Sequence, residues 1–270
     1  MKSLHSFPVQ QRAAVRCILT DIDDTLTNDG KLTATAYAAM ERWQQKGGLL
    51  IPVTGRPAGW CDHIARMWPV SAVVGENGAF YFWYDQNTRT LRRHYRDDEI
   101  TRSRNRQRLL LAQQAILEAV PGCALASDQA YRVADLAIDF CEDVPQLPET
   151  AIDQIVSIME DFGMTAKVSS IHVNGWFGDY SKLEMCRTLL QEHFSITLPG
   201  QRGQLVFIGD SANDAPLFEY FPLSVGVANI RNQLHRLQTP PTYITRSTGG
   251  YGFAELVDLL LPQGGISARN

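Results

Sequence analysis

The stretch Asp21-Ile22-Asp23-Asp24-Thr25-Leu26-Thr27 decides how this chain folds, because it comes directly after the mainly apolar run 15–20. That run predicts a buried strand, and a strand that ends in carboxylates places charge at its carboxyl end. On an extended chain, the side chains of Asp21 and Asp23 point to the same side. Carboxylates this close repel each other unless a cation or a shared proton lies between them. We therefore expect a hard divalent cation, Mg²⁺ above all, at this strand end.

Taken alone, the acidic stretch also fits a solvated turn. The pattern argues against a calcium-binding loop, because its sixth position is Leu26 instead of Gly and its twelfth is Leu32 instead of Glu. Polar residues at later strand ends of the chain favour a functional site over a simple turn.

Two more predicted strands end in polar groups. The run 49–53 ends in Thr54-Gly55-Arg56-Pro57, which offers a hydroxyl and free N–H groups at a helix start and suits a phosphate, although such turns also simply cap helices. The run 204–209 ends in Asp210-Ser211-Ala212-Asn213-Asp214, whose carboxylates can help to hold a cation. Lys182, in the first turn of a predicted helix over 181–194, adds a permanent positive charge.

Strands and helices alternate on both flanks of the chain, which predicts one parallel sheet. The middle block differs, because it reads as a β-hairpin over 79–95 followed by helices and strands in a mixed order. We predict an α/β fold: a Rossmann-like parallel-sheet core from residues 1–83 and 176–270, with an inserted α+β cap domain over 84–175. Further expectations are a loose leader over 1–14, a helix capped by Thr33, a single strand over 164–173, and a flexible glycine turn over 249–252.

Composition excludes several classes of protein. The 270 residues carry a net charge of -4, which gives no general attraction to nucleic acid or to an anionic membrane. Five scattered cysteines without a C-x-x-C pair argue against a disulfide framework or a zinc site. No membrane span or signal-peptide core is visible, so we expect a cytoplasmic protein; its oligomeric state is left open.

The polar strand ends together match phosphoryl transfer. A carboxylate that attacks a phosphate monoester brings two anions together, so catalysis consists mainly of positioning and of charge neutralisation. Mg²⁺ among Asp21, Asp23 and Asp210 would cancel that repulsion, and Lys182 would act from the opposite side. Asp23 can protonate the departing alcohol and later take a proton from water.

The order of these motifs resembles the haloacid dehalogenase superfamily of aspartate-nucleophile phosphatases, over about residues 15–260. The resemblance rests on Asp-x-Asp-Asp-Thr after a strand, then Thr-Gly-Arg, a lysine, and Gly-Asp-Ser-Ala-Asn-Asp. Over a hundred residues separate Arg56 from Lys182, which is similar to the members with a mixed α+β cap that act on sugar phosphates. The tail over 243–252 is also similar to that group.

The resemblance implies a role for each motif residue. Asp21 would be the nucleophile, Asp23 the acid and base, and Thr54 and Lys182 would hold the phosphate. Mg²⁺ would be bound by Asp21, Asp210 and the carbonyl group of Asp23, with help from Asp214. Asp24 stands where many relatives have glycine. The residues predicted to contact the substrate are Gly55, Arg56, Asn77, His172, Asn174 and Asn213.

Three features have more than one interpretation. His172 and Asn174 either touch a sugar hydroxyl or simply end a strand. The segment Glu76-Asn77-Gly78 is either a turn or a contact to substrate or to a cap hinge. An arginine-rich stretch is either a solvated face, partly neutralised by Asp97, Asp98 and Glu99, or a positive lid for an anionic substrate. Nucleic-acid binding is the third interpretation, and no matching motif accompanies it. The arginines are 89, 92, 93, 96, 102, 104, 106 and 108.

The function predicted from the sequence is a Mg²⁺-dependent phosphomonoesterase acting on a small phosphorylated substrate such as a sugar phosphate. A phosphohexomutase uses the same aspartyl-phosphate chemistry and is an alternative. A phospho-aspartate signalling receiver is a second alternative, but receivers are compact single domains without a large insert. No nucleic acid or membrane partner is expected.

Overall fold

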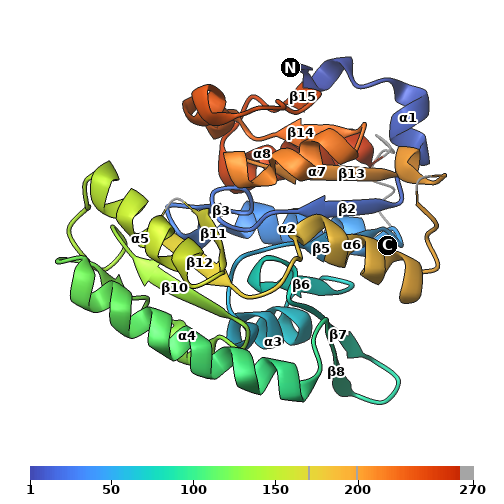
Figure 1. The fold of residues 1–270 in the computed structure, drawn as a ribbon. Coiled ribbons are helices and arrows are strands. Elements are labelled where there is room, and N and C mark those ends of the chain that lie inside the picture. Colours follow the sequence, from blue (N-terminus) through green and yellow to red (C-terminus); the bar gives the residue numbers. More distant parts are fainter. Residues whose placement is uncertain (170, 199, 262–270) are drawn as a thin grey trace. The chain divides into compact units, whose positions relative to one another are not determined.

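The computed structural model describes residues 1–169, 171–198 and 200–261, and it divides into two compact units (Figure 1). The first unit comprises Met1–Val53, Met67–Val73 and Arg187–Asn270, and the second comprises Thr54–Arg66 and Val74–Cys186. The chain therefore enters the second unit twice.

A six-stranded parallel sheet forms the centre of the first unit, as the alternation predicted. Its strands β2 and β13 are buried along their whole length, as expected when both faces of a parallel sheet are covered. Their register pairs Thr20 with Ile208, so the residues after both strands emerge at the same edge. The strands in spatial order are β1 (Lys2–Ser3), β15 (Tyr243–Ile244), β14 (Ser224–Gly226), β13 (Leu205–Gly209), β2 (Cys17–Thr20) and β5 (Leu49–Pro52).

Helices complete the first unit. Helix α2 (Ala34–Gln45) begins as predicted, with the Thr33 hydroxyl accepting the Ala36 N–H at 3.2 Å, and it packs against α8 (Gly249–Leu260). The other helices of this unit are α1 (Val9–Ala14), α7 (Ala215–Tyr220) and the later part of α6 (Lys182–Glu192). Strands β3 (Thr27–Asn28) and β4 (Lys31–Leu32) form a small two-stranded sheet. The 3₁₀ turns are Leu4–Ser6, Arg202–Gln204, Ala212–Asp214 and Ala228–Arg236.

The expected loose leader over 1–14 is wrong. Strand β1 extends the parallel sheet by pairing with β15, and the Phe7 ring stacks on Tyr243 with a centroid distance of 4.8 Å. Edge pairing and one aromatic contact order this segment, and neither leaves a periodic pattern in the sequence.

The expected flexible turn over 249–252 is also wrong, because these residues form the first turn of α8. Glycine is required here by close packing. A Cβ at Gly250 would lie 2.5 Å from the Leu26 carbonyl oxygen and 2.8 Å from the Ala36 Cβ. The Gly250 N–H donates to Asn28 at 3.0 Å, so the glycines let α8 approach the segment after the acidic stretch.

We predict that Gly250→Ala lowers the free energy of unfolding by about 1–3 kcal/mol, because the added methyl group has no space. Gly203→Ala is the matched control, since a Cβ at Gly203 meets nothing within 4 Å. Thermal unfolding of both variants checks this, and an unchanged melting temperature for Gly250→Ala would contradict the packing.

Two sheets organise the second unit. The predicted hairpin is confirmed as β7 (Phe80–Asp85) and β8 (Thr90–Tyr95), which join β6 (Val73–Gly75), a strand that begins at the unit boundary. A four-stranded antiparallel sheet comes next, with helices α4 and α5 on one of its faces (Figure 1). Its elements are α4 (Glu99–Ala119), β9 (Ala124–Leu125), β10 (Asp135–Asp139), α5 (Glu149–Asp161), β11 (Thr165–Val168) and β12 (His172–Trp176), with a 3₁₀ turn at Gln129–Tyr131. Helix α3 (Ala58–Met67) and a 3₁₀ turn at Glu76–Gly78 belong to the earlier part of the chain.

The predicted single strand over 164–173 is wrong, because the segment folds into the antiparallel pair β11 and β12. Ser169 closes the turn: its N–H donates to the His172 carbonyl at 2.8 Å, and its hydroxyl accepts the His172 N–H at 2.9 Å. A turn made by serine, without glycine or proline, carries little signal in the sequence.

The predicted domain boundaries at 83/84 and 175/176 do not coincide with the limits of the two compact units. The assignment of residues 84–175 as an inserted cap stays a prediction.

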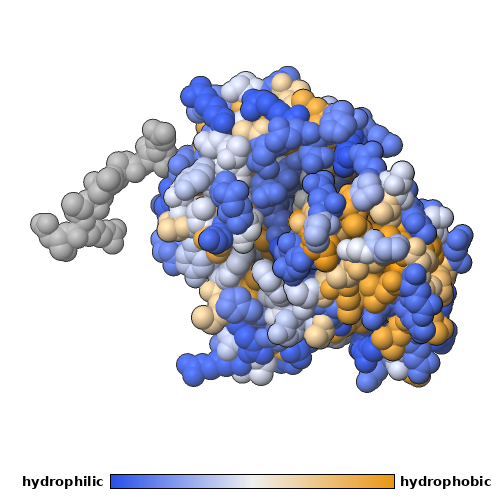
Figure 2. Space-filling model, turned by 90° about the vertical axis from the view of Figure 1, so that its left-hand side faces the viewer, coloured by the Kyte–Doolittle hydropathy of each residue, from blue (hydrophilic) through white to orange (hydrophobic). Residues whose placement is uncertain are grey.

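The surface in Figure 2 is mostly hydrophilic, with one area where hydrophobic residues gather.

Among the described residues, no helix combines the length and the apolar character that a bilayer span requires.

Candidate active site

Backbone hydrogen bonds fix Asp21 at the end of β2. Its N–H donates to the Ile208 carbonyl group at 2.9 Å, and its carbonyl group accepts from the Thr20 hydroxyl at 2.7 Å. Asp21 is only 5% exposed. The backbone that carries this carboxylate is therefore held in place by the pairing of β2 with β13.

Three of the predicted metal ligands come together in the first unit. One carboxylate oxygen from each of Asp21, Asp210 and Asp214 lies within 4.8 Å of the others. Asp214 accepts the Asp210 N–H at 3.3 Å, and the Thr25 hydroxyl donates to Asp210 at 3.3 Å. A Cβ at Gly209 would collide with the Asp214 carboxylate, so glycine allows this approach. Like charges at this spacing repel, and a set of hard oxygen ligands fits Mg²⁺.

The acidic stretch turns sharply after Asp23. Asp24 has a φ of 53°, a left-handed conformation that aspartate tolerates better than most residues and that glycine adopts freely. Its N–H donates to the Thr27 hydroxyl at 2.9 Å, and its carbonyl group accepts from the Asn229 side chain at 2.9 Å. This conformation explains how Asp24 can stand where the resemblance has glycine.

Two predicted site residues of the first unit lie outside the three-carboxylate cluster. The side chain of Asp23 is not a member of it, and its role as a carbonyl ligand and acid stays a prediction. Asn213 accepts from the Ser211 hydroxyl at 2.8 Å in the turn after Asp210, and its contact with substrate also stays a prediction.

In the second unit, the predicted phosphate loop is compact. Thr54 is fully buried, its hydroxyl oxygen accepts the Arg56 N–H at 3.0 Å, and its carbonyl group accepts the Asn77 N–H at 3.1 Å. A Cβ at Gly55 would lie 3.2 Å from the Asn77 side chain. Thr54, Gly55, Arg56 and Asn77 are thus held together, although they come from two separate strand ends.

Lys182 begins helix α6 and is 7% exposed. Ser181 accepts the Glu184 N–H at 3.3 Å and so caps the helix. Gly78, with a φ of +110°, packs so closely that a Cβ there would meet the Ser181 carbonyl oxygen and the Lys182 nitrogen. The turn over 76–78 therefore supports the helix start that carries Lys182.

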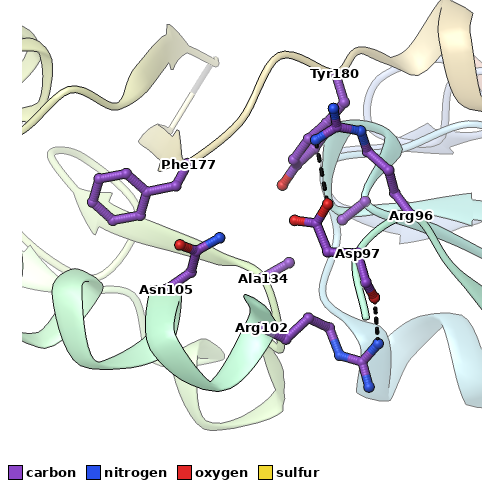
Figure 3. Close-up of a pocket in the computed structure, with 8 residues that line it drawn as sticks. Arg96, Asp97, Arg102, Asn105, Ala134, Phe177 and Tyr180 are labelled. Carbon is purple, nitrogen blue, oxygen red and sulfur yellow. Dashed lines mark hydrogen bonds and ion pairs between the residues drawn. The ribbon is translucent and has the colours of Figure 1, made fainter. Parts of the chain in front are cut away.

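A separate small hollow lies in the second unit (Figure 3). The Tyr180 hydroxyl is buried there and has no hydrogen-bond partner among the described residues. No residue of the predicted site lines this hollow, so it is distinct from the predicted phosphate loop. Its lining residues are Ala79, Arg96, Asp97, Arg102, Asn105, Ala134, Phe177 and Tyr180.

The arginine-rich stretch is largely paired or stacked within the second unit. Arg93 lies 2.7 Å from Asp62, Arg102 stacks on Tyr95 at 4.0 Å, and the Arg108 guanidinium lies 3.5 Å from the centre of the Phe177 ring. These contacts favour the interpretation as a partly neutralised face over the positive lid.

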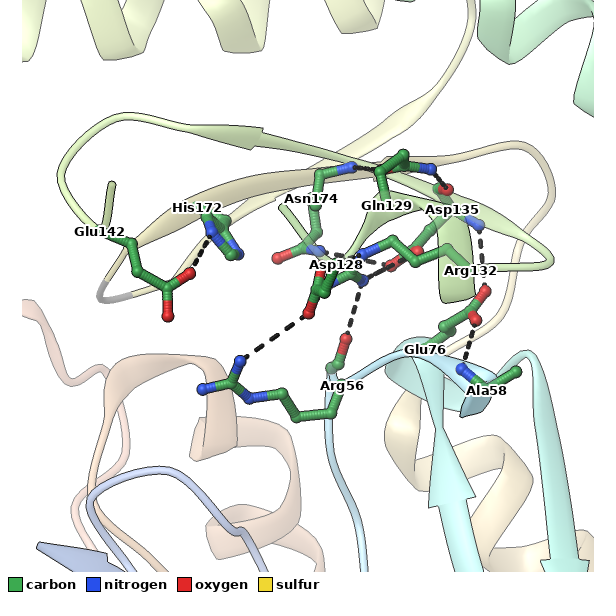
Figure 4. A network of polar contacts seen from close by, with 12 residues as sticks. Arg56, Ala58, Glu76, Asp128, Gln129, Arg132, Asp135, Glu142, His172 and Asn174 are labelled. Atoms are coloured by element: carbon green, nitrogen blue, oxygen red, sulfur yellow. Dashed lines mark hydrogen bonds and ion pairs between the residues drawn. The ribbon is translucent and has the colours of Figure 1, made fainter. Parts of the chain in front are cut away.

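Glu76 is a buried carboxylate that joins two segments. It accepts backbone N–H groups from Ala58 at 2.9 Å, Val133 at 3.0 Å and Ala134 at 2.6 Å, so it links the start of α3 to the start of β10 (Figure 4). Burial raises the pKa of Glu76 to about 8, and the nearby Asp135 carboxylate adds to the rise, while Arg132 and the amide donors oppose it. The contact of the 76–78 segment with substrate or with a cap hinge stays a prediction.

Arg132 is the centre of a buried charge network (Figure 4). Its side chain is 2% exposed and donates to Asp135 at 3.0 Å, to Asp128 at 3.1 Å and to the Gly55 carbonyl group at 3.0 Å. Arg56 reaches the same Asp128 carboxylate at 3.8 Å. The predicted phosphate loop is thus tied to the antiparallel sheet through Arg132.

His172 and Asn174 lie on β12 and are almost fully buried. The Asn174 side chain donates to Asp135 at 3.3 Å, and the His172 Nε2 lies 2.9 Å from the Glu142 carboxylate. Burial and the nearby Arg132 lower the pKa of His172, whereas burial raises the pKa of Glu142. Both residues have partners within the second unit, and their contact with a sugar stays a prediction.

Sequence reasoning missed three acids and one base of this network, and it named Glu76 only as part of the segment 76–78. The missed residues are Asp128, Arg132, Asp135 and Glu142. Arg132 pairs with Asp128, four residues before it, and with Asp135, three residues after it, but this charge spacing does not distinguish a buried network from a solvated one. Glu76 accepts from amides up to 59 residues away, which no local motif marks.

Comparison with known families confirms the resemblance drawn from the motifs. Residues 18–105 match the family of haloacid dehalogenase-like hydrolases, a range that includes the acidic stretch and the Thr54 loop. The chain has the haloacid dehalogenase fold. The prediction of an enzyme, a hydrolase of this kind, agrees with this match. No curated protein sequence matches the chain.

Solved structures share the fold over nearly the whole chain. A Thermoplasma acidophilum protein is 17% identical with a TM-score of 0.68, and the match covers 91% of this chain and 98% of that one. A putative HAD/COF-like hydrolase from Plasmodium vivax is 16% identical with a TM-score of 0.66, covering 92% and 96%. The sucrose-phosphatase of Synechocystis sp. PCC6803, in complex with sucrose and phosphate, is 18% identical with a TM-score of 0.63, covering 90% and 97%.

We predict that Arg132→Ala lowers the free energy of unfolding by about 3–5 kcal/mol, because it leaves buried carboxylates without their main compensating charge. Arg106→Ala is the matched control, since Arg106 is exposed and such a change is worth about 0.5 kcal/mol or less. Urea unfolding of the two variants checks this, and equal losses would show that the network contributes little.

We predict that the His172 imidazole titrates below the ordinary value of about 6.5 in an NMR experiment. Because its folded-state pKa is lowered, the contribution of His172 to stability is present above that ordinary value and is lost as the pH falls through the folded-state value. Asp128→Asn removes a carboxylate that raises this pKa, so the titration should move lower still. A move upward would disprove the assignment.

Proposed function

We propose that this protein is a Mg²⁺-dependent phosphomonoesterase that hydrolyses a sugar phosphate or a similar small phosphorylated metabolite. The observation that carries the proposal is the cluster of Asp21, Asp210 and Asp214 at neighbouring strand ends. Bound Mg²⁺ would neutralise charge on the phosphate oxygens and on these carboxylates.

In the first proposed step, a carboxylate oxygen of Asp21 attacks phosphorus. The bond from Asp21 to phosphorus forms while the bond from phosphorus to the substrate oxygen breaks. Asp23 gives its proton to the departing alcohol oxygen. The product of this step is an aspartyl phosphate and a free alcohol.

In the second step, Asp23 takes a proton from a water molecule as that water attacks phosphorus. The bond from Asp21 to phosphorus breaks, and inorganic phosphate leaves. Each step returns the acid and base to the form that the next one needs, so the cycle requires no other reactant than water.

We assign the remaining predicted residues to the phosphate and the substrate. The Thr54 hydroxyl and the Lys182 ammonium group would hold phosphate oxygens, as positioning and neutralisation require. His172 and Asn174 would contact a sugar hydroxyl, and an inserted cap over 84–175 would exclude water in the first step. The other proposed substrate contacts are Gly55, Arg56, Asn77 and Asn213.

A sugar phosphate is the substrate class we favour. The sucrose-phosphatase of similar fold was solved with sucrose and phosphate, which supports the class without identifying the sugar. A panel of phosphorylated metabolites, ranked by kcat/KM, tests this choice. Conversion of a hexose 1-phosphate to its 6-phosphate, with no phosphate released, would identify a mutase instead.

We predict that Asp21→Asn lowers phosphate release from p-nitrophenyl phosphate by at least about a thousandfold, because the neutral amide cannot form the aspartyl phosphate. Asp29→Asn makes the same chemical change at an exposed position outside the cluster and should retain the rate. A full rate in Asp21→Asn would end the proposed mechanism.

We predict that Mg²⁺ raises the melting temperature of the protein in a concentration-dependent way, because an ion that binds only the folded state stabilises it. Asp214→Asn should shift that response to higher Mg²⁺ concentration, and chelation with EDTA should stop phosphate release. A melting temperature that does not change with Mg²⁺ concentration would argue against the metal site, even if the protein releases phosphate.

A further inference from the structure

Helix α4 is apolar on two opposite sides. Leu109, Ala112 and Ile116 face inward and belong to the core of the second unit. The same helix exposes four large hydrophobic side chains: Ile100 (74%), Leu110 (58%), Leu111 (61%) and Leu117 (39%). Large apolar side chains that stay exposed on the outer side of such a helix indicate a surface for a partner.

The exposed side chains have a regular spacing. Ile100, Leu110 and Leu117 share one side of α4 with Ser103, Gln107 and Gln114, and these six positions recur in alternate steps of three and four residues. Positions with this spacing face a partner when two helices pair, and here three of the six are apolar and three are polar. We call these six residues the α4 seam.

Charges flank the α4 seam in a self-complementary order. Arg104, Leu111 and Glu118 lie seven residues apart on one side of it, and all three are exposed. If two copies of α4 run antiparallel about a two-fold axis at Leu111, Arg104 faces Glu118 of the partner subunit at both ends.

We propose that the α4 seam is a self-association surface on which a second copy of this chain docks its own α4 in the antiparallel direction. The segment 100–117 is about 27 Å long at 1.5 Å per residue, which gives a small interface. The dimer is therefore weak, with a dissociation constant in the micromolar range.

An anionic membrane surface fits the same face less well. Gln107 lies on the seam and would lose its hydrogen bonds to water among acyl chains. The Gln114 side chain donates to Glu118 at 2.9 Å, so burying Gln114 there would also bring the Glu118 carboxylate toward the acyl chains. Against a second copy, the two glutamines can donate to and accept from polar side chains of the same seam. The polar positions thus favour a protein partner of the same sequence.

Sedimentation velocity tests the proposal with the full-length protein between about 1 and 500 μM, where small interfaces dissociate. The expected result is a reversible shift from monomer to dimer. Leu111→Glu places two carboxylates at the two-fold axis and should raise the dissociation constant at least about tenfold. Val9→Glu is the control at an exposed apolar position (71%) of the first unit, and it should leave the constant unchanged. Equal melting temperatures would show that both variants fold.

Charge reversal tests the antiparallel arrangement. Arg104→Glu and Glu118→Arg should each weaken the dimer, and the double variant should recover it, because the flanking pair is restored with exchanged signs. A protein that stays monomeric throughout the concentration range, a Leu111→Glu variant that dimerises normally, or a double variant without recovery would overturn the proposal. So would co-sedimentation with phosphatidylserine vesicles in the absence of self-association.

Discussion

The repulsion among Asp21, Asp210 and Asp214 is the constraint on which the candidate site depends. Two unit charges about 4 Å apart cost about 4 kcal/mol at an effective dielectric constant of about 20. The pairing of β2 with β13 holds Asp21 and Asp210 at one sheet edge against this cost, and Gly209 makes room for Asp214. Backbone pairing thus prepares a site for positive charge before any substrate arrives.

In the second unit, buried carboxylates are compensated by an arginine and by backbone N–H groups. Arg132 is buried together with Asp128 and Asp135, and Glu76 is buried against backbone N–H groups. Buried ion pairs add little net stability, but they tolerate few alternative arrangements, since each carboxylate loses its compensation when a neighbour moves. Moving the loop from Thr54 to Arg56 would break contacts of this network and leave buried charges without compensation, so the network holds the loop in place.

Local sequence signals predicted most of the elements and missed those formed by distant contacts. The cap by Thr33 and the hairpin over 80–95 arise from short-range rules, and both are present. The single strand over 164–173 was wrong because a serine turn has no glycine or proline to mark it. The flexible turn over 249–252 was wrong because close packing required those glycines.

By itself, the sequence determined the α/β alternation and the positions of the acids that come after the strands, because strand periodicity and strand ends are local properties of the chain. Only the tertiary structure decided the role of Glu76, whose carboxylate binds amides up to 59 residues away. It also decided which leucines of α4 are buried and which are exposed, since burial depends on what the fold places against each side of the helix. Folding brings such partners together from distant parts of the chain, so the residues next to them in the sequence do not reveal the contact.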